Sequence, residues 1–299
     1  MRKISKILII FWTGFIGVLA LYGSFSMIID PTGNLLQMQN MLVYFKKMPF
    51  YEILFKDYLF SGITLLIVNG ITNITAFILI LLNKKIGYVL GMVFGITLMM
   101  WIGIQFYLFA PEIYALDVIF MIFGFLQFVC GLLAYVRYMQ SIFKYEILDY
   151  EIKNNDVAVV YFSRQGYTRK IAYEKAMELQ CKLIEIRTTE KINGNAGFWW
   201  CGRFAIHKWE MPLSSIDEDI KSFKRLYIYC PIWAFSICSP IRSFIKKYQN
   251  DINHVDFTII HFMNANYDFA FKEVEDILAN KIIAKHSISS QYGINKTLY

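Results

Sequence analysis

Four long apolar stretches in the first half of this 299-residue chain limit its possible folds more than any other feature. A helix needs about 20 apolar residues to cross the hydrocarbon core of a bilayer. Each stretch reaches that length, and charged residues lie at its ends rather than in its interior. The stretches are residues 7–29, 59–82, 86–110 and 118–138. We therefore expect residues 1–138 to form a four-helix transmembrane domain.

The second half of the chain has a different composition. Only 17 of the 53 charged residues lie in residues 1–150, whereas residues 151–299 contain 20 Lys and Arg against 16 Asp and Glu. Residues 156–299 are therefore expected to form a separate soluble domain, with residues 139–155 as a linker. A basic domain of this kind is attracted to anionic lipid, so we expect the bilayer itself to be a partner.

The positions of Lys and Arg predict the orientation of the spans. Basic residues precede the first span, join the second to the third and follow the fourth: Arg2, Lys3, Lys6, Lys84, Lys85, Arg137 and Lys144. This distribution predicts a multi-pass cell-membrane protein with both termini in the cytoplasm. The first apolar stretch is too long for a signal peptide and lacks a small-residue cleavage site, so we expect an uncleaved span. The outer loop 30–58 departs from the rule because it carries Lys46, Lys47 and Lys56.

Polar residues inside the spans are few. Residues 1–150 contain no histidine, which excludes paired histidine ligands for a haem between the spans. Asn69, Asn73, Gln105 and Gln127 either join the helices by hydrogen bonds or bind a substrate, and the first interpretation is favoured. Glycines at 87, 91 and 95 indicate a helix-packing face.

The first half also resembles a family of small bacterial four-span proteins of unknown function. The resemblance covers roughly residues 10–135 and rests on short motifs: DPTG at 30–33, PF at 49–50, NG at 69–70, and WI at 101–102 with Gln105. It implies the four-span topology and no activity.

The second half alternates predicted strands and helices. Strands are expected at residues 157–162, 183–187, 226–230, 257–262 and 287–290, and helices at 171–179, 239–248 and 269–278. The second helix in this half begins after Ser239, the expected N-cap, with Pro240 in its first position. This alternation predicts an α/β domain with a doubly wound parallel sheet. Ligands in such sheets bind beyond the carboxyl ends of the strands.

The loop after the first predicted strand is rich in hydroxyl groups, with Ser163 and Thr168 around Gly166. Main-chain N–H groups at the start of a helix attract phosphate, although such a loop can also be a simple helix cap. The fingerprints of dinucleotide-binding and nucleotide triphosphatase loops are absent. The cysteines have no C-x-x-C spacing, so neither a metal nor a dithiol site is expected. Lys and Arg do not cluster, so no nucleic-acid partner is predicted, and no catalytic residue is assigned.

Three sequence blocks resemble the flavodoxin family: VVYFSRQGYTRKIA at 159–172, CPIWA at 230–234 and SPIRSF at 239–244, with GFWWCGRFAI at 197–206 similar to an insertion of short members. The resemblance implies bound FMN. Its phosphate would lie against Ser163, Arg164, Gln165, Gly166, Tyr167 and Thr168. Trp233 would lie against the isoalloxazine ring, with Pro231, Ile232 and Ala234 shaping the turn. Asn264, Ala265, Asn266 and Tyr267 would form a third loop, with Tyr267 over the other ring face.

Two functions of different classes follow from these features. The first is a membrane-anchored flavodoxin-like protein that passes electrons from a cytoplasmic donor to a membrane acceptor, either a quinone or a partner protein. A quinone or nitro-compound reductase differs from it only in catalytic turnover. The alternative is a small transporter or signalling bundle in which the flavodoxin-like module is regulatory.

Overall fold

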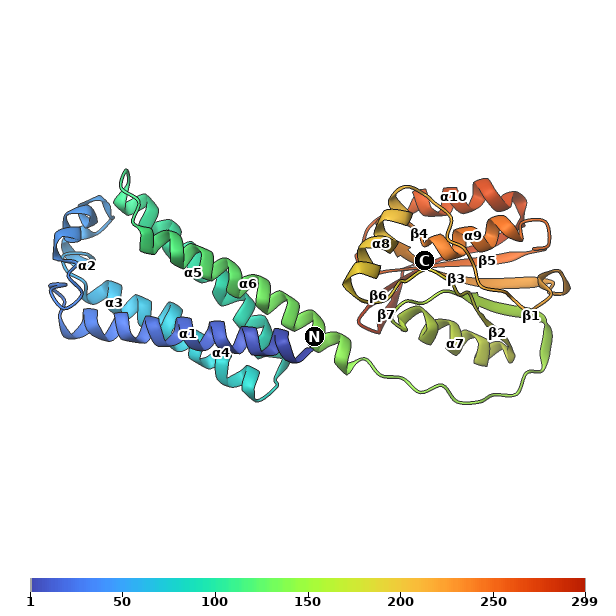
Figure 1. Cartoon of the computed structure of the whole chain (residues 1–299), viewed down its shortest axis with the longest axis horizontal. Helices are drawn as coiled ribbons and strands as arrows, with labels where there is room; N and C mark the ends of the chain where they lie inside the picture. The colour runs from blue at the N-terminus through green and yellow to red at the C-terminus, as the bar shows by residue number, and fades with distance from the viewer. Residues whose placement is uncertain (1, 299) are drawn as a thin grey trace. The chain divides into compact units, whose positions relative to one another are not determined.

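The computed structural model describes residues 2–298, apart from the side chains of Arg2 and Asn195. The chain divides into two compact units, Met1–Ile142 and Phe143–Tyr299 (Figure 1). Each unit has its own hydrophobic core.

The first unit contains four helical segments long and apolar enough to cross a membrane. They are α1 (Arg2–Ile29), the continuous segment α3 (Leu59–Leu65), η2 (Leu66–Ile71) and α4 (Thr72–Leu81), then α5 (Lys85–Phe109) and α6 (Ala115–Ile142). Their lengths confirm four helices at the predicted places. The second is not a uniform α-helix, because η2 is π-helical. A π-helical turn inside a helix is frequently associated with function.

Small residues let the helices of the first unit approach closely. A Cβ placed on Gly95 would lie 2.7 Å from the carbonyl oxygen of Gly124 on α6, so only glycine allows this approach. Gln127 on α6 is fully buried and donates hydrogen bonds to Asn73 Oδ1 (2.7 Å) and to the Gly91 carbonyl (3.0 Å). Close packing and interhelical hydrogen bonds are the usual forces between apolar helices. The structure thus gives Gln127 and Asn73 the expected interhelical role.

The loop between the first two spans contains η1 (Gln39–Lys47) and α2 (Tyr51–Leu54). Lys47 at the end of η1 donates to the carbonyl groups of Leu108 (3.0 Å) and Ala110 (2.8 Å), at the end of α5. A cation is stabilised at a helix carboxyl end, where carbonyl groups lack partners. Lys47 is one of the basic residues in the loop that did not fit the Lys and Arg rule for the orientation of the spans. This capping gives it a structural role.

The second unit is built on a mainly parallel sheet with the order β2-β1-β3-β5-β6-β7. The parallel strands are β1 (Asn154–Tyr161), β2 (Cys181–Glu185), β3 (Arg225–Trp233), β5 (Val255–His261) and β6 (Ile282–Gln291). The short strand β4 (Ser236–Ile237) pairs with the end of β3, and β7 (Ile294–Thr297) pairs antiparallel with β6. Counting only the parallel strands, the order is the 2-1-3-4-5 of flavodoxin-like sheets.

Helices cover both faces of this sheet. α7 (Tyr167–Leu179) lies on one face, and α8 (Gly194–Ile206), α9 (Ser239–Lys247) and α10 (Asp268–Leu278) lie on the other (Figure 1). The short turns η3 (Ile220–Ser222) and η4 (Ala279–Lys281) complete the unit. The larger core lies under α9 and α10 and includes Val160, Ile228 and Phe244. Because helices cover both faces of the sheet, the side chains on both faces of β1 are buried, which explains its continuous apolar run.

The start of α9 differs from the sequence prediction. The helix begins at Ser239, and Cys238 is its N-cap residue. The Ser239 hydroxyl accepts a hydrogen bond from Arg242 Nη1 (3.0 Å), so this hydroxyl does not cap the helix, and Pro240 occupies the second position. The predicted cap was wrong because Arg242, which is 1% exposed, competes for the hydroxyl oxygen.

Residues 143–153 form no regular element and belong to the second unit. We call this segment the strap. Its Leu148 exchanges two hydrogen bonds of 2.9 Å with the Tyr173 hydroxyl on α7, one through the main-chain N–H and one through the carbonyl. The Tyr150 hydroxyl donates to the Cys181 carbonyl (2.8 Å). These contacts hold the strap along α7 and the start of β2.

Candidate functional site

Three loops meet at one edge of the sheet because their strands are neighbours. β2 lies on one side of the β1–β3 pair, and β5 and β6 lie on the other. The connections after β1 and β3 therefore leave the sheet in opposite directions, and a crevice opens between them at the carboxyl ends. The loop after β5 lies next to the loop after β3, since Pro231 pairs with Ile260.

The first loop, residues 162–166, turns the chain from β1 into α7. Gly166 is the N-cap residue of α7, and its φ of +94° is a conformation that other residues rarely adopt. Its N–H donates to Ser163 Oγ (3.0 Å), and its carbonyl accepts the first helical hydrogen bond from Lys170 (2.9 Å). The next three N–H groups, of Tyr167, Thr168 and Arg169, have no acceptor within the helix. This turn therefore presents main-chain donors at the positive end of a helix dipole.

Two arginines beside this turn have different roles. Arg164 donates to the carbonyl groups of Ile192 (2.8 Å) and Gly194 (2.6 Å), so it joins the first loop to the start of α8. Arg169 donates to the Tyr161 hydroxyl (3.0 Å) and pairs with Glu185. Burial opposes ionisation of Glu185, but hydrogen bonds from Arg169 and Arg187 outweigh it, so the pKa of Glu185 lies below its usual value.

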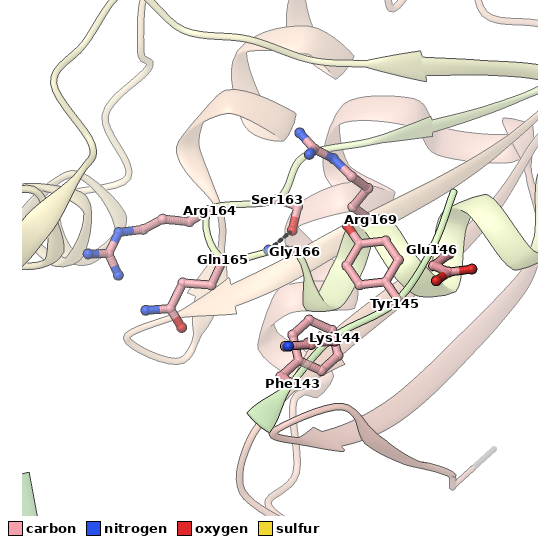
Figure 2. A pocket seen from close by; sticks show the side chains of 9 residues that line it. All are labelled: Phe143, Lys144, Tyr145, Glu146, Ser163, Arg164, Gln165, Gly166 and Arg169. Carbon is pink, nitrogen blue, oxygen red and sulfur yellow. Dashed lines mark hydrogen bonds between the residues drawn. The ribbon is translucent and has the colours of Figure 1, made fainter. Parts of the chain in front are cut away.

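A cavity of about 720 Å³ lies against the first loop. Figure 2 shows its lining, which comes from two parts of the second unit: Ser163, Arg164, Gln165, Gly166 and Arg169 from the first loop and α7, and Phe143, Lys144, Tyr145 and Glu146 from the strap. Ligand pockets commonly have volumes of about 300–1,000 Å³. The structure thus brings four of the six predicted phosphate-loop residues to one cavity. Thr168 is buried and does not line the cavity, and Tyr167 packs on Phe143.

The second loop is a tight hairpin between β3 and β4. Trp233 pairs with Ser236, and the two residues between them, Ala234 and Phe235, have positive φ angles of 45° and 64°. Such a turn normally contains glycine or asparagine, and each non-glycine residue in this conformation costs about 1–3 kcal/mol. Trp233 is half-buried and packs edge-on against Phe162 (5.3 Å), whereas Phe235 is 61% exposed. The exposed aromatic side chain of this loop is thus Phe235. Pro231 and Ile232, at the end of β3, are half-buried.

The third loop differs from the expectation for Tyr267. This side chain is only 3% exposed, its ring packs on His261 (4.4 Å), and its hydroxyl donates to the Met263 carbonyl (3.2 Å). Phe235 lies nearly parallel to it at 6.4 Å, on the outer side. The accessible aromatic ring at this edge of the sheet is therefore that of Phe235, and the ring of Tyr267 is buried.

The other residues of the third loop are exposed. Asn266 Oδ1 accepts a hydrogen bond from the N–H of Asp268 (2.8 Å), and this turn begins α10. Asn264 and Ala265 are exposed, and they lie outside the lining of the cavity.

His261 is a buried titratable residue at this edge that no sequence pattern singled out. Its Nδ1 lies 2.7 Å from the Met263 carbonyl, which can only accept, so Nδ1 carries the proton. Its Nε2 accepts from the Ser287 hydroxyl at 2.8 Å. Burial lowers the pKa of His261, which agrees with a neutral ring that supports the third loop.

Arg242 is a second such residue, and it supports the hairpin. Its guanidinium pairs with Glu273 on α10 and donates to Ser236 Oγ (2.7 Å) and to the Ile237 carbonyl (3.1 Å). The buried thiols of Cys230 and Cys238 lie 3.7 Å apart beside it. Their contact depends on the β3–β4 pairing, so sequence spacing could not predict it.

The first loop can hold a phosphate ester by its donors. The donors are the three helix N–H groups and the Ser163 hydroxyl. Main-chain N–H groups at the start of a helix can bind an anion even when no fully charged cation lies beside it. The three-residue spacing of Ser163 and Gly166 fixes this geometry, because the serine oxygen closes the turn. Among residues 2–298, no cluster of three or more His, Cys, Asp or Glu side chains is placed to hold a metal ion.

No protein-family model matches the chain, and no curated protein matches it either. Among solved structures, it is similar to a flavoprotein of Lactobacillus acidophilus NCFM in complex with FMN, at 17% identity and a TM-score of 0.39, over 45% of this chain and 93% of that one. It is also similar to flavoproteins of Bacteroides eggerthii DSM 20697 (17% identity, TM-score 0.41, 45% and 88% covered) and Bacteroides uniformis ATCC 8492 (20%, 0.38, 46% and 93%).

Proposed function

We propose that this chain is a membrane-anchored flavodoxin-like protein that binds FMN non-covalently and transfers electrons at the cytoplasmic face of the membrane. The observation that carries the proposal is the turn between β1 and α7, where Gly166 and Ser163 arrange main-chain donors at the switch point of a 2-1-3-4-5 sheet. In sheets of this order FMN binds at that point.

The residues of the chain would hold the cofactor in two ways. Ser163 and the first N–H groups of α7 would bind its phosphate. Trp233 and Phe235 on the second loop would supply apolar surface for the ring system. When bound, FMN supplies one- and two-electron redox chemistry, and the protein adjusts its potential. An apolar surface disfavours additional negative charge near it, so this loop is expected to lower the reduction potential.

The four apolar helices of the first unit would anchor this site to the membrane. The proposed electron path runs from a cytoplasmic donor to a membrane acceptor, either a quinone or a partner protein. The excess of basic residues in the second half would favour contact with anionic lipid.

The first experiment is the visible spectrum of the full chain purified in detergent. We expect a flavin spectrum, either as purified or after addition of FMN. Ser163→Ala should weaken FMN binding, because it removes a hydroxyl that lines the cavity and closes the turn, and Trp233→Ala should shift the reduction potential. A colourless protein that cannot be reconstituted with FMN refutes the proposal. Riboflavin, which lacks the phosphate, is the control ligand for Ser163→Ala, because loss of phosphate contacts should affect FMN alone.

One observation favours a second candidate, in which the bundle is a small transporter or signalling unit and the second unit regulates it. Asn69 lies in the π-helical segment η2 and is fully buried, yet neither polar atom of its amide has a hydrogen-bond partner among the described residues. A buried unpaired amide is costly unless a ligand or water satisfies it. If Asn69→Leu abolishes the activity of the chain in cells and Ser163→Ala does not, the second candidate prevails.

A further inference from the structure

The strap lies at the proposed phosphate site although the sequence predicted only a linker there. Four of its residues, 143–146, line the same cavity as Ser163 and Gly166 (Figure 2). The strap begins directly after α6, so the chain that leaves the last apolar helix becomes part of the cavity wall.

Aromatic contacts fix the strap on both sides of Lys144. The Phe143 ring packs on the Tyr167 ring at 4.4 Å and occupies the place that a side chain on Gly293 would need. The Tyr145 hydroxyl lies 3.3 Å from the position of a Cβ on Gly166. The main chain at Lys144 is therefore held beside the turn that presents the phosphate donors.

The charges around the cavity favour an anion. Lys144 is exposed and forms no ion pair with any residue that the structure describes. Arg164 is bound to carbonyl oxygens, not to a carboxylate. Against these, Glu146 lines the same cavity, and Glu185 already pairs with Arg169. Among these groups Lys144 is the flexible cation that can follow a phosphate.

We propose that the strap is part of the cofactor site and that Lys144 binds the phosphate group of FMN. This inference rests on the proposed function and adds a binding residue that the three-loop pattern does not contain. It also means that the phosphate site is complete only when the chain leaving α6 lies in place.

The test compares FMN and riboflavin binding to the full chain in lipid-free detergent, which removes anionic lipid as a competing partner. For Lys144→Met we expect the Kd of FMN to rise roughly three- to fivefold at low salt, the upper end of the range for an exposed charge pair, and this difference to shrink as salt is added. Riboflavin binding should not change. Lys144→Arg should retain FMN binding, and Lys272→Met, an equal charge change on α10, should have no effect.

Three results overturn the inference, and they separate its failure from that of the proposed function. If wild type and Lys144→Met bind FMN equally, or if the variant weakens FMN and riboflavin alike, Lys144 does not bind the phosphate although the flavin site stands. If the wild-type chain binds neither flavin, the proposed function fails, and the inference fails with it.

Discussion

The substitution Gly166→Ala tests whether main-chain geometry at the β1–α7 turn recognises the phosphate. Gly166 has a φ of +94°, and a residue with a Cβ loses about 1–2 kcal/mol in the left-handed region. The new Cβ would also lie 3.3 Å from the Tyr145 ring, a tight contact that a small movement of this side chain relieves. Backbone strain is therefore the larger effect.

Strain at Gly166 should reach FMN binding through the helix N–H groups. If the alanine variant relaxes to a negative φ, the N–H of residue 166 leaves Ser163 Oγ and the donors that follow change direction. Binding must then restore the strained turn, at a cost of about 1–2 kcal/mol, which corresponds to a roughly 5- to 30-fold rise in the Kd of FMN. Riboflavin should bind as before.

The assay is quenching of flavin fluorescence by the full chain in detergent. Gly202→Ala on α8 is the matched control, because a Cβ there meets no atom within 4 Å and the backbone is helical. Adding Tyr145→Ala to Gly166→Ala separates the two effects, since a steric cause would be relieved and backbone strain would not. Unchanged FMN affinity in Gly166→Ala refutes the phosphate-loop assignment.

Three further predictions concern the packing around the site and in the bundle. Arg242→Met should lower the free energy of unfolding by about 3–5 kcal/mol in urea titrations, because it removes the buried cation paired with Glu273 and leaves this carboxylate only Lys208, at 4.0 Å, and the Ser236 hydroxyl; a loss below about 1 kcal/mol would contradict this. Burial raises the pKa of Cys181 and of Cys201 to about 11, so a thiol reagent should modify these residues slowly at pH 8 and about tenfold faster per pH unit up to that pKa, and fast modification at pH 8 in the folded state would be inconsistent with their burial. Gln127→Leu should destabilise the bundle by about 0.6–2 kcal/mol by removing two interhelical hydrogen bonds, measured by thermal unfolding in detergent, and a more stable variant would argue against that role.

The sequence predicted strand positions well where the strands are apolar and poorly where they are polar. β5 begins at Val255, two residues before the predicted start at 257, because Asp256 interrupts the apolar run. In the structure this carboxylate is paired with Arg225 on the neighbouring strand at 2.6 Å, so a charged residue is tolerated inside the sheet. β6 likewise extends well beyond the predicted residues 287–290. Both differences come from cross-strand partners that are distant in the sequence.

The loops of the site were predicted with less success than the strands. The hairpin at Ala234 and Phe235 has none of the residues that mark such a turn, so only the β3–β4 pairing reveals it. The burial of Tyr267 against His261 depends on packing between β5 and the following loop. The first loop was recognisable because its geometry is local: Ser163 and Gly166 are three residues apart and close the turn themselves.

The main-chain origin of the proposed phosphate donors also means that the side chain of Gln165 contributes little to phosphate binding. Gln165 is exposed at the rim of the cavity, and in Figure 2 its side chain extends away from Tyr145. The three N–H groups at the start of α7 are set by the conformation of Gly166, which no side chain at 165 alters. A phosphate in this turn would therefore keep most of its hydrogen bonds whatever residue occupies position 165. The same reasoning makes Gly166 more sensitive to substitution than any of the side chains around it.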